Sequence, residues 1–184
     1  MINYNEKLFE NIKNNLIKHH QLYKKIRCKA EYLEEILTIS FRSTGYDVVW
    51  KPGSHDRQKD LVINGEHLSI KSGVLKPRKK KINISGHRLG RFKHDLNKIT
   101  DYLNKSTDTL CVYDPDKESK DHKYSIALIK KEKFSGLKNK WKKRGGSFIQ
   151  NNHFNVEFKI NISMSDQIWW EVPSDQLEFS EKLI

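Results

Sequence analysis

Asp60, Ser69 and Lys71 are the residues whose types and spacing in this chain most suggest chemistry. They flank Asn64-Gly65, the dipeptide most typical of a two-residue turn between β-strands. Such a turn places Asp60 opposite Ser69, and side-chain alternation puts Lys71 diagonally beside both on one face. There the carboxylate can hold a cation, and the amine can orient water or offset negative charge. The alternative is a surface ion pair worth about 0–1 kcal/mol.

Glu34 is a second candidate carboxylate. A helix is predicted over residues 26–43, because apolar residues recur there at steps of three and four and a glycine follows at position 45. Glu34 falls about 40° from the centre of this apolar stripe when the helical period is applied. A carboxylate so placed is costly without a partner or a metal, so we expect Glu34 to point at the hairpin cluster. The alternative is a helix-edge glutamate that reaches solvent or pairs with Lys29 or Lys71.

Together these segments resemble the PD-(D/E)xK nuclease superfamily, which includes many type II restriction endonucleases and the archaeal Holliday-junction resolvases. The resemblance covers residues 30–73 and rests on EEILTISFRSTGYDVVW followed by KDLVINGEHLSIKSG. By position, Glu34 matches the helical glutamate of the family, Asp60 its metal-binding aspartate and Lys71 its catalytic lysine.

Two departures from the family pattern bear on the metal site. Ser69 stands where the acid of acid-x-Lys is expected, and Lys59 stands where proline is usual. The resemblance implies Mg²⁺ as the cofactor, held by Asp60 and Glu34 with Ser69 as a weaker ligand. It also implies in-line hydrolysis of DNA that leaves a 5′-phosphate, with Lys71 orienting water or offsetting charge. The number of metal ions, one or two, is left open.

Two histidines near this cluster are weaker candidates. His67 shares the predicted site face, and His55 lies in the loop that precedes Asp60. Either can bind a metal or assist proton transfer, but a lone histidine on a strand is more often a structural residue.

The segment after the hairpin is predicted to contact DNA. Residues 76–94 are basic, and within them SGHRLGR (85–91) follows a lysine-rich loop and precedes a predicted helix. Arginine has the planar fork that reads guanine, whereas lysine contacts phosphates without reading sequence. The alternative is an ordinary polar turn that caps the helix. The candidate DNA-binding residues are Arg88, Arg91, His87, Ser85, Lys79, Lys80 and Lys81.

The charge balance favours a polyanionic partner. The 184 residues include 35 Lys and Arg against 23 Asp and Glu, a formal net charge of +12, and neutralised phosphates release counterions. No apolar run approaches the roughly 20 residues that span a membrane, and no basic helix has the broad apolar face of a membrane-surface helix. Cys28 and Cys111 lack metal-ligand spacing and suit a reducing compartment. We therefore expect a soluble cytoplasmic protein, bacterial or archaeal in view of the resemblance.

The expected fold is α/β or α+β, with a central mixed β-sheet flanked by helices and a restriction-endonuclease-like core. A single nuclease domain is predicted, with a helical extension at 1–25, a catalytic core at 26–130, and a basic helix and β-hairpin at 131–184. In the basic helix, residues 138–144 either grip the DNA backbone or form a solvated face. Helices are predicted over 6–24, 26–43, 91–105 and 131–144, and strands over 46–51, 59–63, 66–71, 108–114, 123–130, 152–163 and 167–172.

Three functions fit these observations. The leading hypothesis is a type II restriction endonuclease, or its small catalytic subunit, that cuts double-stranded DNA as a homodimer or with a larger DNA-recognising subunit. The second is a structure-selective nuclease of the resolvase kind. The third is a noncatalytic DNA-binding module in which Asp60 and Lys71 merely pair.

Overall fold

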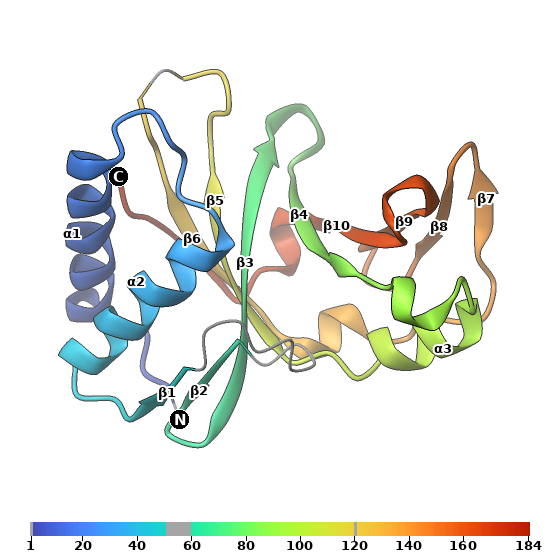
Figure 1. Ribbon diagram of the computed structural model, residues 1–184, viewed down its shortest axis with the longest axis horizontal. Coiled ribbons are helices and arrows are strands. Elements are labelled where there is room, and N and C mark those ends of the chain that lie inside the picture. The colour runs from blue at the N-terminus through green and yellow to red at the C-terminus, as the bar shows by residue number, and fades with distance from the viewer. Residues whose placement is uncertain (1, 51–59, 120) are drawn as a thin grey trace.

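The computed structural model describes residues 2–50, 60–119 and 121–184. Within these ranges the α-helices are α1 (Glu6–Leu22), α2 (Ala30–Ser43) and α3 (Leu96–Leu103). Asn5 caps α1 and Asp95 caps α3, because each side chain accepts hydrogen bonds from amides of the first helical turn. Figure 1 shows α1 and α2 side by side at one end of the molecule and α3 towards the other.

A single mixed sheet runs through the protein. Its strands follow the order β11-β6-β5-β3-β4-β10-β9-β8-β7, with β2 joining β1 to β3 off this path. β3 and β5 pair in parallel, and the other strand pairs are antiparallel. The protein is therefore α+β with a mixed central sheet, as predicted. The strands are β1 (Val48–Val49), β2 (Leu61–Ile63), β3 (Glu66–Lys76), β4 (Lys81–Arg88), β5 (Asp108–Asp114), β6 (Ser125–Ile129), β7 (Lys142–Arg144), β8 (Ser147–Asn151), β9 (Glu157–Asn161), β10 (Gln167–Pro173) and β11 (Phe179–Lys182).

The two faces of the sheet carry different hydrophobic cores. On β5, Leu110 and Val112 belong to a cluster that includes the buried residues of α1 and α2. Cys111 and Tyr113 belong to a second cluster with the buried residues of α3. Because successive strand residues face opposite sides, the α1–α2 pair and α3 pack on opposite faces of the sheet. The predicted N-terminal extension is thus an integral part of the first core.

The hairpin that positions the candidate residues has the predicted register. Leu61 pairs with Leu68 and Ile63 with Glu66, so the turn consists of Asn64-Gly65. The predicted apolar face is buried, since Leu61, Ile63, Leu68 and Ile70 are at most 1% exposed.

Other predicted elements differ in extent. α2 begins at Ala30 and not at residue 26, because residues 24–26 form a turn after α1. β1 is shorter than the predicted strand over 46–51, whose last residue lies outside the described ranges. Residues 85–88, predicted as a loop or turn, complete β4, whose alternating Ile82 and Ile84 are buried between β3 and β10. The final hairpin is confirmed as β9 and β10, although β9 begins only at Glu157.

The predicted basic helix over 131–144 is wrong. Only Lys131–Phe134 forms a short 3-10 turn, and the chain then extends into β7. The backbone is already extended at Ser135, and Gly136 follows it with a φ of 79°. A turn at Gly145-Gly146 then pairs β7 with β8. Residues 138–144 are therefore an extended basic segment at the edge of the sheet.

None of the helices in the described part of the chain is long and apolar enough to cross a membrane.

Candidate active site

The candidate site lies at a gap along one edge of β3. β5 pairs with β3 over residues 68–74 and occupies one edge of that strand. β2 pairs with residues 66–68 and β4 with residues 73–76, so both must lie along the other edge. Between them, residues 69–72 have no ladder partner on that edge among the described residues. We call this gap, at residues 69–72 between β2 and β4, the fork in β3. Its backbone amides and carbonyls are open to side chains or ligands.

Asp60 directly precedes the first residue of β2 and fills part of this gap. Its Oδ2 accepts three hydrogen bonds: from Ser69 Oγ at 3.0 Å, from the Ile70 amide at 2.6 Å and from Lys71 Nζ at 2.7 Å. The Asp60 and Lys71 side chains are only 19% and 12% exposed. The prediction that Asp60, Ser69 and Lys71 meet is therefore confirmed, in a setting less exposed than a surface ion pair.

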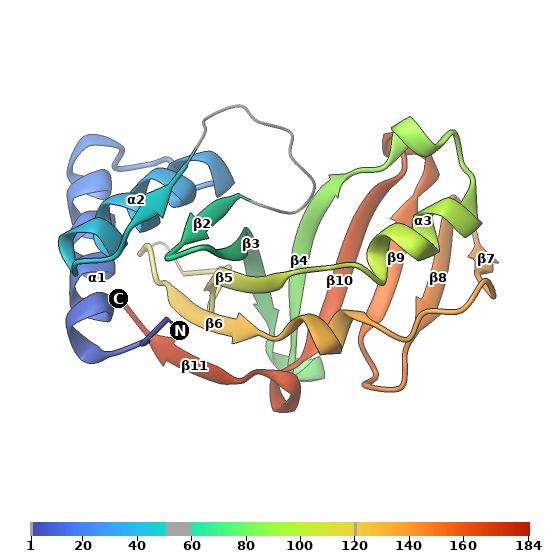
Figure 2. The same cartoon turned by 90° about the horizontal axis from the view of Figure 1, so that it is seen from below.

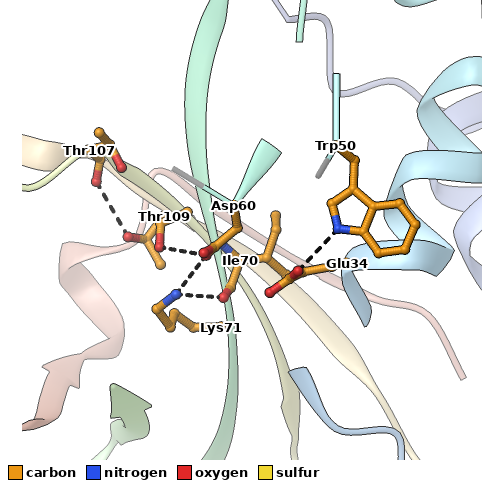
Figure 3. Close-up of polar contacts among 8 residues, drawn as sticks. Glu34, Trp50, Asp60, Ile70, Lys71, Thr107 and Thr109 are labelled. Carbon is orange, nitrogen blue, oxygen red and sulfur yellow. Dashed lines mark hydrogen bonds and ion pairs between the residues drawn. The ribbon is translucent and has the colours of Figure 1, made fainter. Parts of the chain in front are cut away.

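Lys71 also contacts the backbone at the fork. Its Nζ lies 2.8 Å from the Ile70 carbonyl oxygen as well as 2.7 Å from Asp60 Oδ2. Figure 3 shows the ammonium group between these two oxygens. A positive charge thus already lies between a carboxylate and a carbonyl, the oxygen types that bind hard cations.

Glu34 approaches the same cluster from α2. Its carboxylate is half-buried, and Oε2 accepts a hydrogen bond from Trp50 Nε1 at 3.2 Å. Burial raises the pKa of Glu34, the Trp50 hydrogen bond opposes that rise, and the negative charge of Asp60 adds to it. The charges of Asp60 and Lys71 both act on the pKa of Glu34, which agrees with the prediction that Glu34 points at the hairpin cluster. Figure 3 shows its carboxylate turned towards Asp60 and Lys71. Trp50 was not identified from the sequence, where nothing links the residue to Glu34.

His87 reaches the neighbourhood of the site through a β-bulge. Ser85 pairs with Trp169, and Arg88 pairs with Gln167, so three steps on β4 match two on β10. The extra residue turns His87 onto the face of the second core, where its ring packs edge-on against Tyr102 and Trp170. Gly86 permits this geometry, because a Cβ there would lie 2.5 Å from Ile168 Cγ2.

His87 is neutral at physiological pH. Burial, helped by the positive charges of Lys71 and Arg91 and opposed by the smaller effect of Asp60, lowers the pKa of His87 to about 4. Its Nε2 is buried and has no hydrogen-bond partner among the described residues. The ring therefore packs inside the protein. A contact with DNA, as predicted from the sequence, would require it on the surface.

The predicted basic recognition segment over 76–94 is divided between two ends of the β3–β4 hairpin. Lys79 and Lys80 are at the exposed tip with Lys81 directly after it, and Lys79 pairs with Glu171 at 3.6 Å. The tip follows the end of β3, five residues and therefore about 17 Å from Lys71.

The arginines of that segment lie at the other end, near the candidate site. Arg88 ends β4 and is exposed. Arg91 is exposed as well, with its guanidinium 4.6 Å from the centroid of the Tyr102 ring. Ser85 points to the opposite face from the second core and accepts a hydrogen bond from Gln167 Nε2 at 3.0 Å. The arginines, and not the lysines, are thus the predicted DNA contacts that lie close to the site.

The two histidine candidates have different outcomes. His67 is exposed on β3 beside the hairpin turn. His55, like Lys59, lies outside the described residues.

Comparisons with known proteins found no match among family models, curated proteins or solved structures. The chemistry of the site therefore rests on its own residues. Within the described ranges, no group of three or more His, Cys, Asp or Glu side chains is arranged to hold a metal ion. What the fork offers a cation is two carboxylates, Asp60 and Glu34, together with the Ile70 carbonyl.

Proposed function

We propose that this protein is a Mg²⁺-dependent endonuclease that hydrolyses phosphodiester bonds of double-stranded DNA. The observation that carries the proposal is the position of Lys71 Nζ, which contacts Asp60 Oδ2 at 2.7 Å and the Ile70 carbonyl at 2.8 Å in the β3 gap. The residues that carry the resemblance to PD-(D/E)xK nucleases, Glu34 included, thus converge although 37 positions separate Glu34 from Lys71.

The donor set fits Mg²⁺ better than a softer metal. Mg²⁺ prefers oxygen ligands and keeps several waters, so it needs only one or two protein carboxylates. Asp60, Glu34 and the Ile70 carbonyl supply oxygens of this kind. Magnesium bound there supplies polarisation of the scissile phosphate and stabilisation of its developing negative charge.

The remaining chemistry belongs to the side chains. Asp60 is held in place by the Ser69 hydroxyl and the Ile70 amide, which both donate to its Oδ2. Ser69 donates to Asp60 and is 3% exposed, which makes it a positioning residue in place of the expected acid. Lys71, whose ammonium contacts Asp60 Oδ2 and the Ile70 carbonyl, would orient the attacking water or offset charge at the phosphate.

Within this proposal, a type II restriction endonuclease or its small catalytic subunit is the specific form we favour. The exposed arginines beside the site, Arg88 and Arg91, support it, because arginine reads guanine in the major groove. A homodimer would match a palindromic target. Alternatively, a larger partner subunit would supply the DNA recognition.

Cleavage assays on three substrates test the proposal: supercoiled plasmid, linear duplex and a synthetic four-way junction, each with Mg²⁺ and with EDTA. We expect Mg²⁺-dependent discrete fragments from linear duplex, lost in Asp60→Ala and retained in Lys18→Ala, an exposed lysine of α1. Cutting confined to the junction would favour the resolvase-like alternative. Binding without cutting on every substrate would contradict the enzyme proposal and favour the noncatalytic DNA-binding module.

A further inference from the structure

Beyond the candidate site, the sheet continues for five strands, from β4 through β10, β9 and β8 to β7. One face of this extension belongs to the second core, with Phe158, Ile160, Ile168 and Trp170 buried beneath α3. Residues that alternate with these point to the other face, which none of the helices in the described ranges covers. Figure 2 shows the five strands as a curved sheet at the opposite end of the molecule from α1.

The strand register arranges the uncovered face in cross-strand rows. Two of them reach all five strands, and a third, shorter row contains Asn83, Glu171, Glu157 and Asn151. Each row contains one residue from every strand that it crosses, because directly paired residues share a face. The first row runs along Arg88, Gln167, Asn161, Ser147 and Arg144. The second row runs along Ser85, Trp169, Lys159, Ile149 and Lys142.

The first two rows are basic and polar. Arg88, Arg144, Lys159 and Lys142 are all exposed. The acids on the same face are few: Glu171 is already paired with Lys76 and Lys79, and Glu157 is the cross-strand neighbour of Glu171 on β9. Over β7 and β8 the face is hollowed into a depression of about 430 Å³, whose charged lining is Lys138, Lys140, Lys142 and Arg144 against one acid, Glu157.

The first row begins at Arg88, on the opposite face of the sheet from the His87 ring and from Lys71. Arg88 directly follows His87, whose pKa is coupled to the charges of Lys71 and Asp60. From Arg88 to Arg144 there are four strand spacings, a distance of about 19 Å. Duplex DNA carries one charge for about every 1.7 Å of its axis, so cations across this distance can contact several phosphates of one molecule.

We propose that this uncovered face of β4, β10, β9, β8 and β7, the basic sheet face, binds the phosphate backbone of double-stranded DNA. The inference rests on the proposed function for its choice of duplex DNA as the partner. Arginine, lysine, asparagine and serine are the side chains that contact phosphates. A membrane would require a broad apolar face, and here Trp169 and Ile149 are the only apolar members of the first two rows.

A charge-reversal experiment tests the proposal. The test variant is Lys142→Glu/Lys159→Glu, and the matched control is Lys7→Glu/Lys18→Glu on α1. All four lysines are exposed, and both variants change the net charge by the same amount. Affinity for a labelled duplex is measured by fluorescence anisotropy in EDTA, over a range of salt concentrations, with thermal melting as the check on folding.

We expect the test variant to lose at least tenfold in affinity while the control stays within about threefold. The slope of log K against log salt should become shallower by about 1 to 2, as two phosphate contacts are lost. Equal losses in the two variants, no loss in either, tighter binding to duplex RNA or to anionic vesicles, or no binding of duplex by the wild type would overturn the proposal. Binding that depends on the basic sheet face without any cleavage would uphold the DNA surface and contradict only the nuclease.

Discussion

Replacing His87 with phenylalanine is expected to flatten the dependence of stability on acid pH. The ring packs against Tyr102 and Trp170, and its buried Nε2 has no hydrogen-bond partner among the described residues. Burial is the main reason that its pKa falls from 6.5 to about 4. Phenylalanine keeps the aromatic contacts and removes the titrating group, so the variant should fold at least as stably as the wild type at neutral pH.

The sign and size of the effect follow from linkage between protonation and folding. Because the pKa of His87 is lower in the folded protein, the unfolded chain binds a proton between pH 6.5 and 4 that the folded protein does not. The contribution of neutral His87 is fully present above pH 6.5 and is lost as the pH falls towards 4. The difference between the two pKa values corresponds to about 3 kcal/mol, at about 1.4 kcal/mol for each pKa unit.

Urea unfolding at several pH values between 7.5 and 4 measures this effect. The free energy of unfolding of the wild type should fall relative to that of His87→Phe by about 1 kcal/mol or more per pH unit below pH 6. His67→Phe, at an exposed position, is the control and should follow the wild type at every pH. Parallel profiles for the wild type and His87→Phe would refute the assignment of His87 as a buried neutral histidine.

Three further predictions concern the fork and the bulge. Glu34→Gln should weaken Mg²⁺ binding in isothermal titration calorimetry at least fivefold, and an unchanged affinity would exclude Glu34 from the metal site; Glu35→Gln, an exposed neighbour on α2, is the control. Gly86→Ala should lower the free energy of unfolding by roughly 1–3 kcal/mol, because the new Cβ meets Ile168 at 2.5 Å. In the same urea experiment, Gly146→Ala should change little, since its Cβ meets nothing within 4 Å. Ser69→Ala should cost about 1 kcal/mol or less in stability, because two donors still hold Asp60; a larger loss would mean that the serine does more than position the carboxylate.

The local parts of the site were predictable from the sequence. A two-residue Asn64-Gly65 turn fixes the pairing of its flanking strands, and a one-residue slip would expose the apolar side chains at Leu61 and Ile63. The direction of Glu34 follows from the helical period alone, which needs no knowledge of the rest of the fold.

Features that depend on distant pairing were not predictable. The bulge that turns His87 inward exists only because β10, some 80 residues later, pairs with β4 in a shifted register. The same pairing separates Arg88 from Lys79–Lys81, although all of these residues belong to one basic stretch of the sequence. The basic residues 138–144 were predicted as part of a helix. The positive φ of Gly136 and the turn at Gly145-Gly146 instead lead the chain into β7, where sheet geometry decides which lysines share a face.

The most direct test of the central claim is single-turnover cleavage of duplex DNA with Mg²⁺ by wild type and Lys71→Met. Methionine keeps the unbranched apolar stem of the side chain and removes its charge. If Lys71 acts on the reacting phosphate or water, the cleavage rate should fall at least 100-fold, while affinity for the same duplex stays within about threefold. A Lys71→Met protein that folds, binds DNA and cuts at the wild-type rate would show that the Asp60–Lys71 pair is structural and that the proposed active site lies elsewhere or does not exist.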